Sequence, residues 1–566
     1  MEKKFTRREF LRLAAIAAAA TAAGCAAPAT PVPPAPTTAP TAVPTSVPTS
    51  APAAQPTAVP ATKPPAQPTA VPPTAVPKAA GGTLNYAEAG DFSAFNPWRM
   101  EAANMNMHNQ MFDRLVWKDD QGKEQLGLAQ GYEMAKDGLS ATVKMRESAK
   151  WHDGKEIVAQ DIVNMFQYTK DEKLLAAELG VRKTQSLVAP VKDVKAVDKF
   201  TVQFTFTGPL PYFTEILDYF WVERIDDPAD PAFMKKPPVG SGPFKLAEYV
   251  PAQYARMVRH TDYHVKDRPY LDTFMFRRLD KAETLTPNLQ SGAVQGIFVS
   301  NVADLATLRA DKNFNVVLAN AGSINLVMVN VLKPPLDKKE VRQALSYAMN
   351  RVEYAKSAFF GASDPISSMF FMPTSLGYRE DLNKAYAFNL DTAAKLLEKA
   401  GVKNLSLNML VTPRWPAHKL FALIWQADLA KIGVKLNVTE VEQAKFMEAG
   451  AAKDLTGVDI LPWLVGRTTR DPAIFFGTQT PYRGGKTAAH GWVNDELEKL
   501  IDQGAQELDP AKRKTIYQRC NEIVVEEAPV IQIATDPRMW AWSSKVKGVI
   551  TDLVGNITLT AAQIQS

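Results

Sequence analysis

The sequence predicts an α/β fold in more than one domain, and three observations support this prediction. A strand, a helix and a second strand follow one another between residues 405 and 438. Apolar residues alternate in the predicted strands and recur every three or four positions in the predicted helices. The chain has 566 residues, which is more than one hydrophobic core usually organises. The strand–helix–strand unit implies a sheet with a helical crossover.

Residues 1–24 have the three regions of an export signal peptide. Arg7 and Arg8 precede an apolar run, and Cys25 follows it. The paired arginines resemble a twin-arginine signal, and the small residues before Cys25 resemble a bacterial lipobox. We therefore predict a lipoprotein that is cleaved before Cys25 and acylated on its thiol. The alternative is an uncleaved anchor, although the run is shorter than the ~20 residues that span a bilayer.

A Pro/Ala/Thr-rich segment follows, and with Cys25 it forms a predicted disordered tether over residues 25–80. It has no aromatic residue, so it cannot bury enough apolar surface to offset chain entropy. The signal peptide and the two lysines of the tether account for the whole net charge of +5. Residues 81–566 are formally neutral, and nucleic acid is not an expected partner.

The first mixed segment begins at residue 81. Its predicted elements are a strand at 81–86, a strand at 139–145, a helix from about residue 160 and a strand at 202–206. Asp153 and Gly154 supply a turn before the helix, and Asp161 in its first turn complements the positive helix end.

The second mixed segment has the clearer α/β pattern. Asp337 and Glu340 form a predicted capping box that opens a helix. Asp391 opens another helix, and Gly401 ends it. The crossover unit then comprises a strand at 405–411, a helix at 416–433 and a strand at 434–438.

Five motifs occur in order between residues 151 and 472. They are Trp151-His152-Asp153-Gly154-Lys155 with the helix start at 159–163, the glycine-rich segment 238–244 with Tyr263 and 289–292 downstream, the helix 341–351, the segment 393–401, and Asp471-Pro472. With these motifs, nearly all of residues 81–566 resembles the bacterial extracellular solute-binding proteins, family 5, the dipeptide-, oligopeptide- and nickel-binding type of ABC importers.

The resemblance implies a two-lobe periplasmic-binding-protein (Venus-flytrap) fold with an extra domain inserted in the first lobe. Lobe one would comprise 81–116, 237–328 and 530–566, the inserted domain 117–236, and lobe two 329–529. It also implies a monomer without a cofactor that captures a solute between its lobes and delivers it to membrane permease subunits. We expect the protein at the outer face of the cell membrane or in the periplasm, anchored through Cys25.

The ligand loops of the family, carried onto this chain, imply eight ligand-binding candidates. These are Asn104, Met107, Phe370, Arg414, Trp415, Trp463, Arg467 and Arg470. Peptide-binding relatives carry an aspartate shortly before the Asp-Pro pair, where this chain has Arg467 and Arg470. Two guanidinium groups would repel an ammonium and attract a carboxylate, a phosphate or a polyhydroxylated ring. A peptide-like solute ranks first, and an oligosaccharide or an organic anion is the alternative.

Most motif residues are expected to be structural. His152 fixes a turn, Arg342 lies on the solvated or salt-bridged side of its helix, and Gly240 and Gly242 suit unusual backbone dihedrals. Cys520 has apolar neighbours at helical spacing, so we interpret it as a small buried hydrophobe.

Two further alternatives concern chemistry. A nickel or haem binder could use His108, His260, His264 and His418. His260 and His264 have helical spacing, but Tyr263 and Pro269 favour an irregular loop there. A secreted hydrolase lacks support because the chain has neither a His-Glu-x-x-His nor a Gly-x-Ser-x-Gly motif. We expect no enzymatic activity and no resident metal.

Overall fold

The computed structural model describes residues 81–90, 95, 97, 102–170, 187–230, 236–319, 322–452, 454–466, 470–478 and 491–565. The predicted signal peptide, Cys25 and the tether lie outside these residues. Within the described part, no helix is both long enough and apolar enough to cross a membrane.

A seven-stranded mixed sheet, the first sheet, has the order β12-β18-β11-β1-β10-β9-β8. Its strands are β1 (Thr83–Glu88), β8 (Phe244–Val250), β9 (Tyr254–Arg259), β10 (Thr273–Arg278), β11 (Gly296–Phe298), β12 (Phe314–Ala319) and β18 (Arg538–Ser543). The accompanying helices are α2 (Ala102–Met111), η2 (Ala282–Thr284), α7 (Leu285–Gln290) and α8 (Asp304–Ala310). β1 pairs in parallel with β10 and β11. Tyr86 at its centre is fully buried and stacks on Trp542 at 5.4 Å.

A four-stranded antiparallel sheet, the small sheet, has the order β4-β5-β7-β6. It consists of β4 (Ala129–Met134), β5 (Ser140–Met145), β6 (Val191–Ala196) and β7 (Thr201–Phe206), with the hairpin β2 (Val116–Lys118) and β3 (Glu124–Leu126) and the helices α3 (Ala159–Lys170) and α6 (Phe213–Tyr219). The predicted strands at 139–145 and 202–206 and the helix near residue 160 are confirmed. α3 buries Ile162, Met165 and Phe166, and Phe166 meets Phe204 of β7 edge-on at 5.2 Å.

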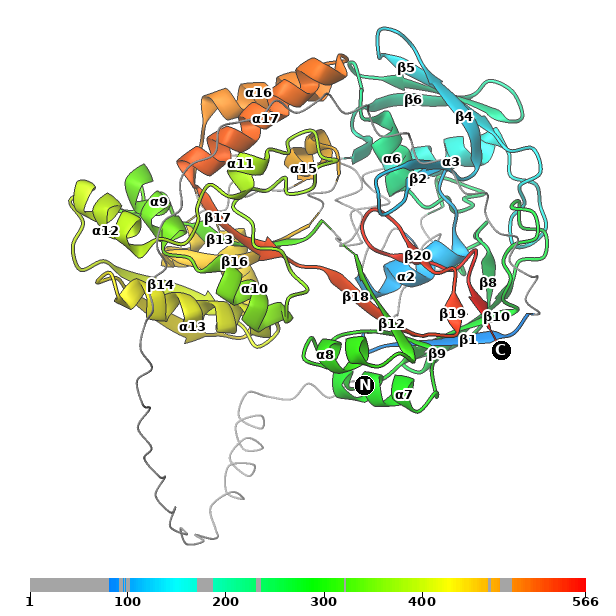
Figure 1. The fold of residues 1–566 in the computed structure, drawn as a ribbon. Helices are drawn as coiled ribbons and strands as arrows, with labels where there is room; N and C mark the ends of the chain where they lie inside the picture. Colours follow the sequence, from blue (N-terminus) through cyan, green and yellow to red (C-terminus); the bar gives the residue numbers. More distant parts are fainter. Residues whose placement is uncertain are drawn as a thin grey trace, which may run out of the picture. The chain divides into compact units, whose positions relative to one another are not determined.

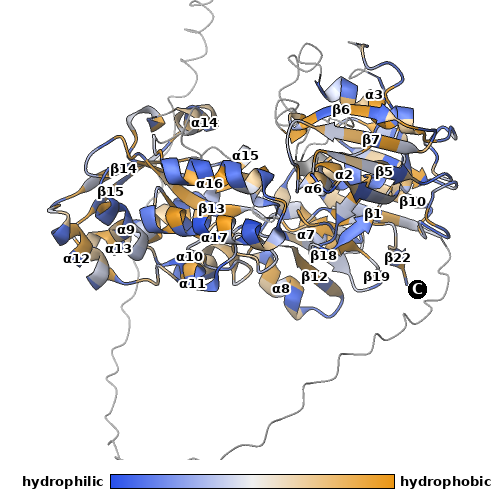
Figure 2. Cartoon of the chain, turned by 90° about the horizontal axis from the view of Figure 1, so that it is seen from above, coloured by the Kyte–Doolittle hydropathy of each residue, from blue (hydrophilic) through white to orange (hydrophobic). Residues whose placement is uncertain are grey.

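A five-stranded sheet, the second sheet, has the order β15-β14-β16-β13-β17. Its strands are β13 (Ile324–Val329), β14 (Ser406–Val411), β15 (Lys435–Glu440), β16 (Ile460–Val465) and β17 (Val530–Thr535). β14 and β15 run parallel and α13 connects them, which confirms the predicted crossover unit. β13 is buried along its whole length. Hydrophilic and apolar residues are both present along α16 (Figure 2).

Helices surround the second sheet, and short strand pairs complete the chain (Figure 1). The helices are α9 (Lys339–Tyr347), α10 (Arg351–Phe359), α11 (Glu380–Asn383), α12 (Leu390–Lys399), α13 (Pro416–Ala430), α14 (Gln443–Ala451), η3 (Leu455–Gly457), α15 (Pro472–Thr478), α16 (Asp495–Gln506) and α17 (Pro510–Glu527). The short strands are β19 (Val546–Lys547), β20 (Ile550–Thr551), β21 (Ile557–Thr558) and β22 (Gln563–Ile564).

Sheet pairing differs from the predicted domain limits at two strands. The limits 237–328 and 530–566 assign most of β13 and all of β17 to lobe one, but both strands lie in the second sheet. β17 pairs with β13 before the chain continues into β18 of the first sheet. The other domain limits stay a prediction.

Two predicted helix starts are wrong. α9 begins at Lys339, and its N-cap Lys338 makes no side-chain capping bond, so Asp337 and Glu340 form no capping box. α12 begins at Leu390, and the side chain of Asn389 accepts the capping hydrogen bond in place of Asp391. Gly401 follows the helix with a positive φ of 69°, as its predicted role as a stop requires.

Arg342 is buried, and of the two predicted roles it has the salt-bridged one, with its guanidinium 3.4 Å from Glu527 Oε2. Its guanidinium donates to the carbonyls of Leu336, Asp337 and Glu527 at 2.8–3.0 Å. The arginine therefore ties α9 to the C-terminal end of α17, where the Glu527 carbonyl lies beyond the reach of the helix's own hydrogen bonds. Cys520 is fully buried in the apolar core of the second sheet, as predicted.

The glycine-rich segment needs small residues because it lies close to other backbone atoms. Gly240 and Gly242 are absent from the positive-φ residues, so the predicted unusual dihedrals are wrong. A Cβ on Gly240 would lie 2.0 Å from the carbonyl oxygen of Met111, at the end of α2. His152 donates its backbone N–H to Gly240 O at 2.9 Å, and its ring lies 3.0 Å from Gly242 O. The histidine therefore fixes its turn against this segment.

We predict that Gly240→Ala lowers the free energy of unfolding by about 1 to 3 kcal/mol, because an overpacked backbone contact must move apart. Gly131→Ala is the matched control, since its Cβ would meet nothing within 4 Å. Chemical denaturation of both variants checks this. Equal stability of the two would show that the contact with Met111 relaxes without cost.

Candidate functional site: the edge where the chain crosses between sheets

The first and second sheets are joined by two chain crossings. One lies between β12 and β13, and the other runs from β17 to β18 as one continuous ribbon (Figure 1). Ala319 pairs with Arg538 in the first sheet, and Ile324 pairs with Thr535 in the second. Both crossings therefore leave each sheet at the same end of its strands. We call Glu88, Asn325, Asp536 and Arg538 the crossing edge.

On the second sheet, aromatic side chains gather at the carboxyl ends of the parallel strands. Trp415 follows β14, Phe446 lies on the helix after β15, and Trp463 lies near the end of β16. Trp463 stacks on Phe446 at 5.8 Å with an interplanar angle of 6°, and Trp415 meets Phe446 edge-on at 5.3 Å. We call these three residues the aromatic wall. Ligands of open α/β sheets bind outside the carboxyl ends of the strands, so the wall is well placed for one.

A neutral polar pair lies beside the aromatic wall. The ring Nε2 of His418 lies 3.3 Å from Asn325 Oδ1, and both side chains are buried. Burial lowers the pKa of His418 to about 4, so the imidazole is uncharged at neutral pH. Trp463 pairs across from Leu326, one residue from Asn325. The pair therefore provides hydrogen-bonding groups without charge.

On the first sheet, a buried carboxyl ends β1. Tyr86 Oη and Asn106 Nδ2 donate to Glu88 Oε1 at 2.5 and 2.6 Å. Burial raises the pKa of Glu88 to about 6, although these hydrogen bonds and Arg538 oppose the rise. Glu88 is therefore held near the point where it changes charge.

The second carboxyl of the crossing edge is Asp536. Burial raises its pKa to about 6, against the influence of Asn325 and Arg538. The Arg538 guanidinium donates to Asn556 Oδ1 and lies 4.0 Å from Met105 Sδ. Two titratable carboxyls and one cation thus share the region where the sheets are joined.

Two of the candidates predicted from the sequence lie at this site. Trp415 and Trp463 meet in the aromatic wall, and both are half-buried. Arg414 precedes them and is exposed. Asn104 lies on α2, with a side chain outside the described residues, and Arg467 is also outside them.

Two other candidates fill hydrophobic cores. Met107 is fully buried among the core residues of the first sheet. Phe370 is fully buried in the second sheet, edge-on to Phe475 at 5.5 Å and to Phe476 at 5.8 Å. Both side chains are buried, and their ligand-binding role stays a prediction.

Arg470 is committed to an ion-pair network. Its guanidinium pairs with Asp218 and lies 3.3 Å from Glu215 Oε2, and both acids lie on α6. Arg114 pairs with Asp218 at 2.9 Å, and Lys118 pairs with Glu215.

The charges of this network balance. Arg114 also pairs with Asp552 at 2.6 Å, so three cations face three carboxylates. Burial lowers the pKa of Arg470, whereas Glu215 opposes that effect. The charge of Arg470 is thus balanced by carboxylates within the protein, and its ligand-binding role stays a prediction.

The four residues of the crossing edge were missed by sequence reasoning. Glu88 ends a predicted strand and Asp536 precedes a proline, but neither has a motif around it. Only the pairing of distant strands brings them together.

His260 and His264, the metal candidates with helical spacing, lie in a loop. His260 contacts Gly242 O through Nδ1 at 3.1 Å, and His264 contacts Asp113 through Nε2 at 3.2 Å. Residues 260–268 form turns instead of a helix, as the sequence indicated. In the part of the chain that the structure describes, no three metal-binding side chains gather.

Known proteins share this fold and are similar in sequence over most of the chain. Residues 123–483 match the bacterial extracellular solute-binding proteins, family 5, middle region. The dipeptide-binding protein of Escherichia coli is 27% identical over 84% of this chain and 93% of its own. Heme-binding protein A of Haemophilus influenzae is 26% identical over 79% and 85%.

A solved structure shows the same fold. The ABC transporter-associated periplasmic binding protein DppA from Helicobacter pylori, in complex with a peptide, superposes with a TM-score of 0.71 at 23% identity. The match covers 86% of this chain and 99% of that chain. The predicted periplasmic-binding-protein fold is therefore confirmed.

We predict that ionisation of Glu88 lowers the free energy of unfolding by about 2 kcal/mol as pH rises from about 4 through 6, and that Glu88→Gln removes this contribution from the pH dependence of stability. The folded state raises the pKa of Glu88 from 4.5 to about 6, so its contribution is complete below 4.5 and is lost above 6. Denaturant unfolding at several pH values measures the effect. Glu398→Gln, at an exposed position on α12, is the control. An unchanged slope in Glu88→Gln would refute the assignment.

Proposed function

Because the chain belongs to the bacterial extracellular solute-binding proteins of family 5, we propose that it captures its solute at the crossing edge and delivers it to an ABC-type permease. One observation carries the location. The aromatic wall and Asn325 come from the second sheet, and Glu88 and Arg538 come from the first. A solute there contacts both halves only when they approach.

Closure of the two halves is the proposed mechanism. A ligand shifts the population toward the state that it binds more tightly. Converting a mostly open population to a mostly closed one needs roughly 5.5 kcal/mol of differential affinity. An aromatic stack with a few charge-assisted hydrogen bonds supplies a contribution of that size. The permease would then recognise the closed form.

A peptide-like solute is the proposed ligand. Glu88 and Asp536 suit an ammonium, and Arg538 suits a carboxylate, so the crossing edge fits a molecule with both charges. The neutralisation of Arg470 by Asp218 and Glu215 weakens the objection to an ammonium. The dipeptide-binding relative supports this class.

An oligosaccharide or an organic anion is the alternative ligand, which Arg467 and the stacking surface of Trp463 would favour. The heme-binding relative supports a haem or nickel complex as a further alternative. A secreted hydrolase is the rival from another class, and turnover of an ester or peptide panel would reveal it.

The remaining predictions concern placement in the cell. We propose export through the twin-arginine signal, acylation of Cys25 and a position at the outer face of the cell membrane, with the tether as a spacer. A monomer is sufficient for the proposed mechanism, because one chain supplies both halves. Mass measurement of the mature N-terminus would test the lipid.

We predict that mass spectrometry of the solute that co-purifies with the protein identifies a short peptide, and that Trp463→Ala weakens its binding about tenfold, or 1.4 kcal/mol. Phe388→Ala is the control, because that ring is exposed elsewhere on the second half. A sugar or an acid in place of the peptide would favour the alternative ligand. An unchanged affinity in Trp463→Ala would remove the aromatic wall from the site.

We predict different outcomes for the two arginines before Asp471. Arg470→Gln breaks a buried ion pair with α6, which should lower the free energy of unfolding by about 3 to 5 kcal/mol. Because that contact with α6 is lost, the radius of gyration of the solute-free protein should increase. Arg467→Gln should lower affinity for an anionic solute without that change. Small-angle scattering with calorimetry separates the two effects. Loss of affinity alone in Arg470→Gln would make it a ligand residue after all.

A further inference from the structure

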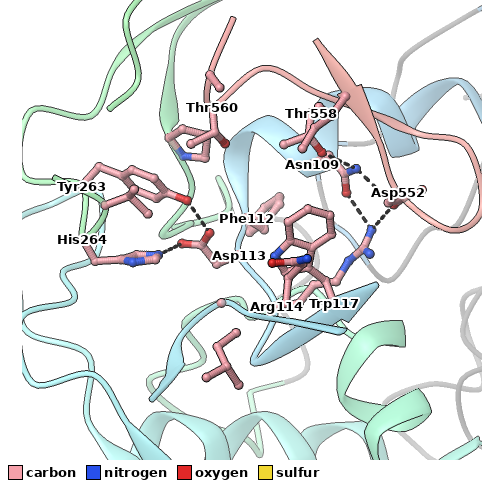
Figure 3. Close-up of a pocket in the computed structure, with 17 residues that line it drawn as sticks. Asn109, Phe112, Asp113, Arg114, Trp117, Tyr263, His264, Asp552, Thr558 and Thr560 are labelled. Carbon is pink, nitrogen blue, oxygen red and sulfur yellow. Dashed lines mark hydrogen bonds and ion pairs between the residues drawn. The ribbon is translucent and has the colours of Figure 1, made fainter. Parts of the chain in front are cut away.

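A cavity lies beside the C-terminal end of α2, and no residue of the crossing edge lines it. Its volume is about 270 Å³. Five parts of the chain contribute to its wall: the end of α2 with residues 112–114, the β2–β3 hairpin with Gly127, Pro243, the loop at 263–265 and the C-terminal segment 550–561. Figure 3 shows side chains from these segments around the cavity.

The charged side chains that line the cavity already have hydrogen-bond or ion-pair partners. Asp113 accepts hydrogen bonds from Tyr263 Oη at 2.8 Å and from His264 Nε2 at 3.2 Å (Figure 3). Arg114 pairs with Asp218 and Asp552.

The second Arg114 amino group also donates to Asn109 Oδ1 at 2.7 Å. An anionic ligand would lose its hydration without finding a free counter-charge, because Arg114 is already balanced by Asp218 and Asp552. A cationic ligand would have to displace the hydrogen bonds that Asp113 already accepts. The cavity is suited to a neutral molecule.

The rest of the wall is mainly apolar, and part of it is exposed to water. Phe112 and Trp117 supply two aromatic rings. Leu126, Val265 and Ile550 line the same cavity and are 42%, 38% and 45% exposed. Apolar side chains from three separate segments thus converge on one opening. A ligand that covered them would gain roughly 25 cal/mol for each Å² of apolar surface removed from water.

We propose that this cavity is a binding site for a small neutral aromatic molecule, separate from the solute site at the crossing edge. An apolar cavity of ~150 Å³ holds benzene, and drug-sized ligands need ~300 Å³ or more. The cavity accordingly fits one ring with a short polar substituent. Phe112 and Trp117 offer the ring contacts, and the hydroxyls of Thr558 and Thr560 offer neutral polar partners.

The test compares three probes of matched size on the purified full chain: benzyl alcohol, benzoate and benzylammonium. Titration calorimetry and saturation-transfer NMR measure their binding. Benzyl alcohol should bind at least about tenfold more tightly than either ion, because only the ions pay an uncompensated desolvation cost. Failure of benzyl alcohol to bind at millimolar concentration, or equal binding of an ion, would overturn the proposal.

Two variants locate the site. Trp117→Ala and Ile550→Ser should each weaken the binding of benzyl alcohol by about fivefold or more. Val352→Ser is the control, because Val352 is 66% exposed on α10, away from the cavity lining. Should Trp117→Ala fail to fold, the exposed Ile550 still gives a decisive result. Unchanged affinity in Ile550→Ser and in a folded Trp117→Ala would place the probe elsewhere.

Discussion

The two chain crossings between the large sheets are the constraint on which the rest of the structure depends. β12 continues toward β13, and β17 continues into β18, so each sheet contains strands that are distant in sequence. The register places both crossings at one edge of each sheet. A side chain at the crossing edge therefore lies next to both the first and the second sheet. The carboxyl ends of β14, β15 and β16 bring the aromatic wall to the same edge.

Buried charges around this frame are held by specific partners, which is the requirement for removing a charge from water. Arg351 is buried and donates to the carbonyls of Ser346, Ile366 and Gln532 at 2.8–3.0 Å. Arg342 does the same for the end of α17. Two arginines from one motif thus hold backbone segments together, instead of binding a ligand or facing solvent.

Much of the fold could be predicted because local patterns carry it. The alternation in 405–411 and 434–438, with a helix between, predicts a crossover unit that the pairing of β14 with β15 confirms. Helix starts were less predictable, since Asn389 caps α12 where Asp391 was expected. Trp415 and Trp463 were identified from the resemblance, but the crossing edge was not, because Glu88 and Asp536 are separated by hundreds of residues.

The sequence by itself determined the α/β class, the family and the order of the segments, because these depend on periodicity and on motifs of contiguous residues. Tertiary structure decided which polar side chains are committed. The residues next to Arg470 in the sequence are the same whether its guanidinium binds a solute or Asp218. The position of α6 in the fold shows that it is paired. Burial and counter-charge are properties of residues that meet in space, so a linear pattern does not contain them.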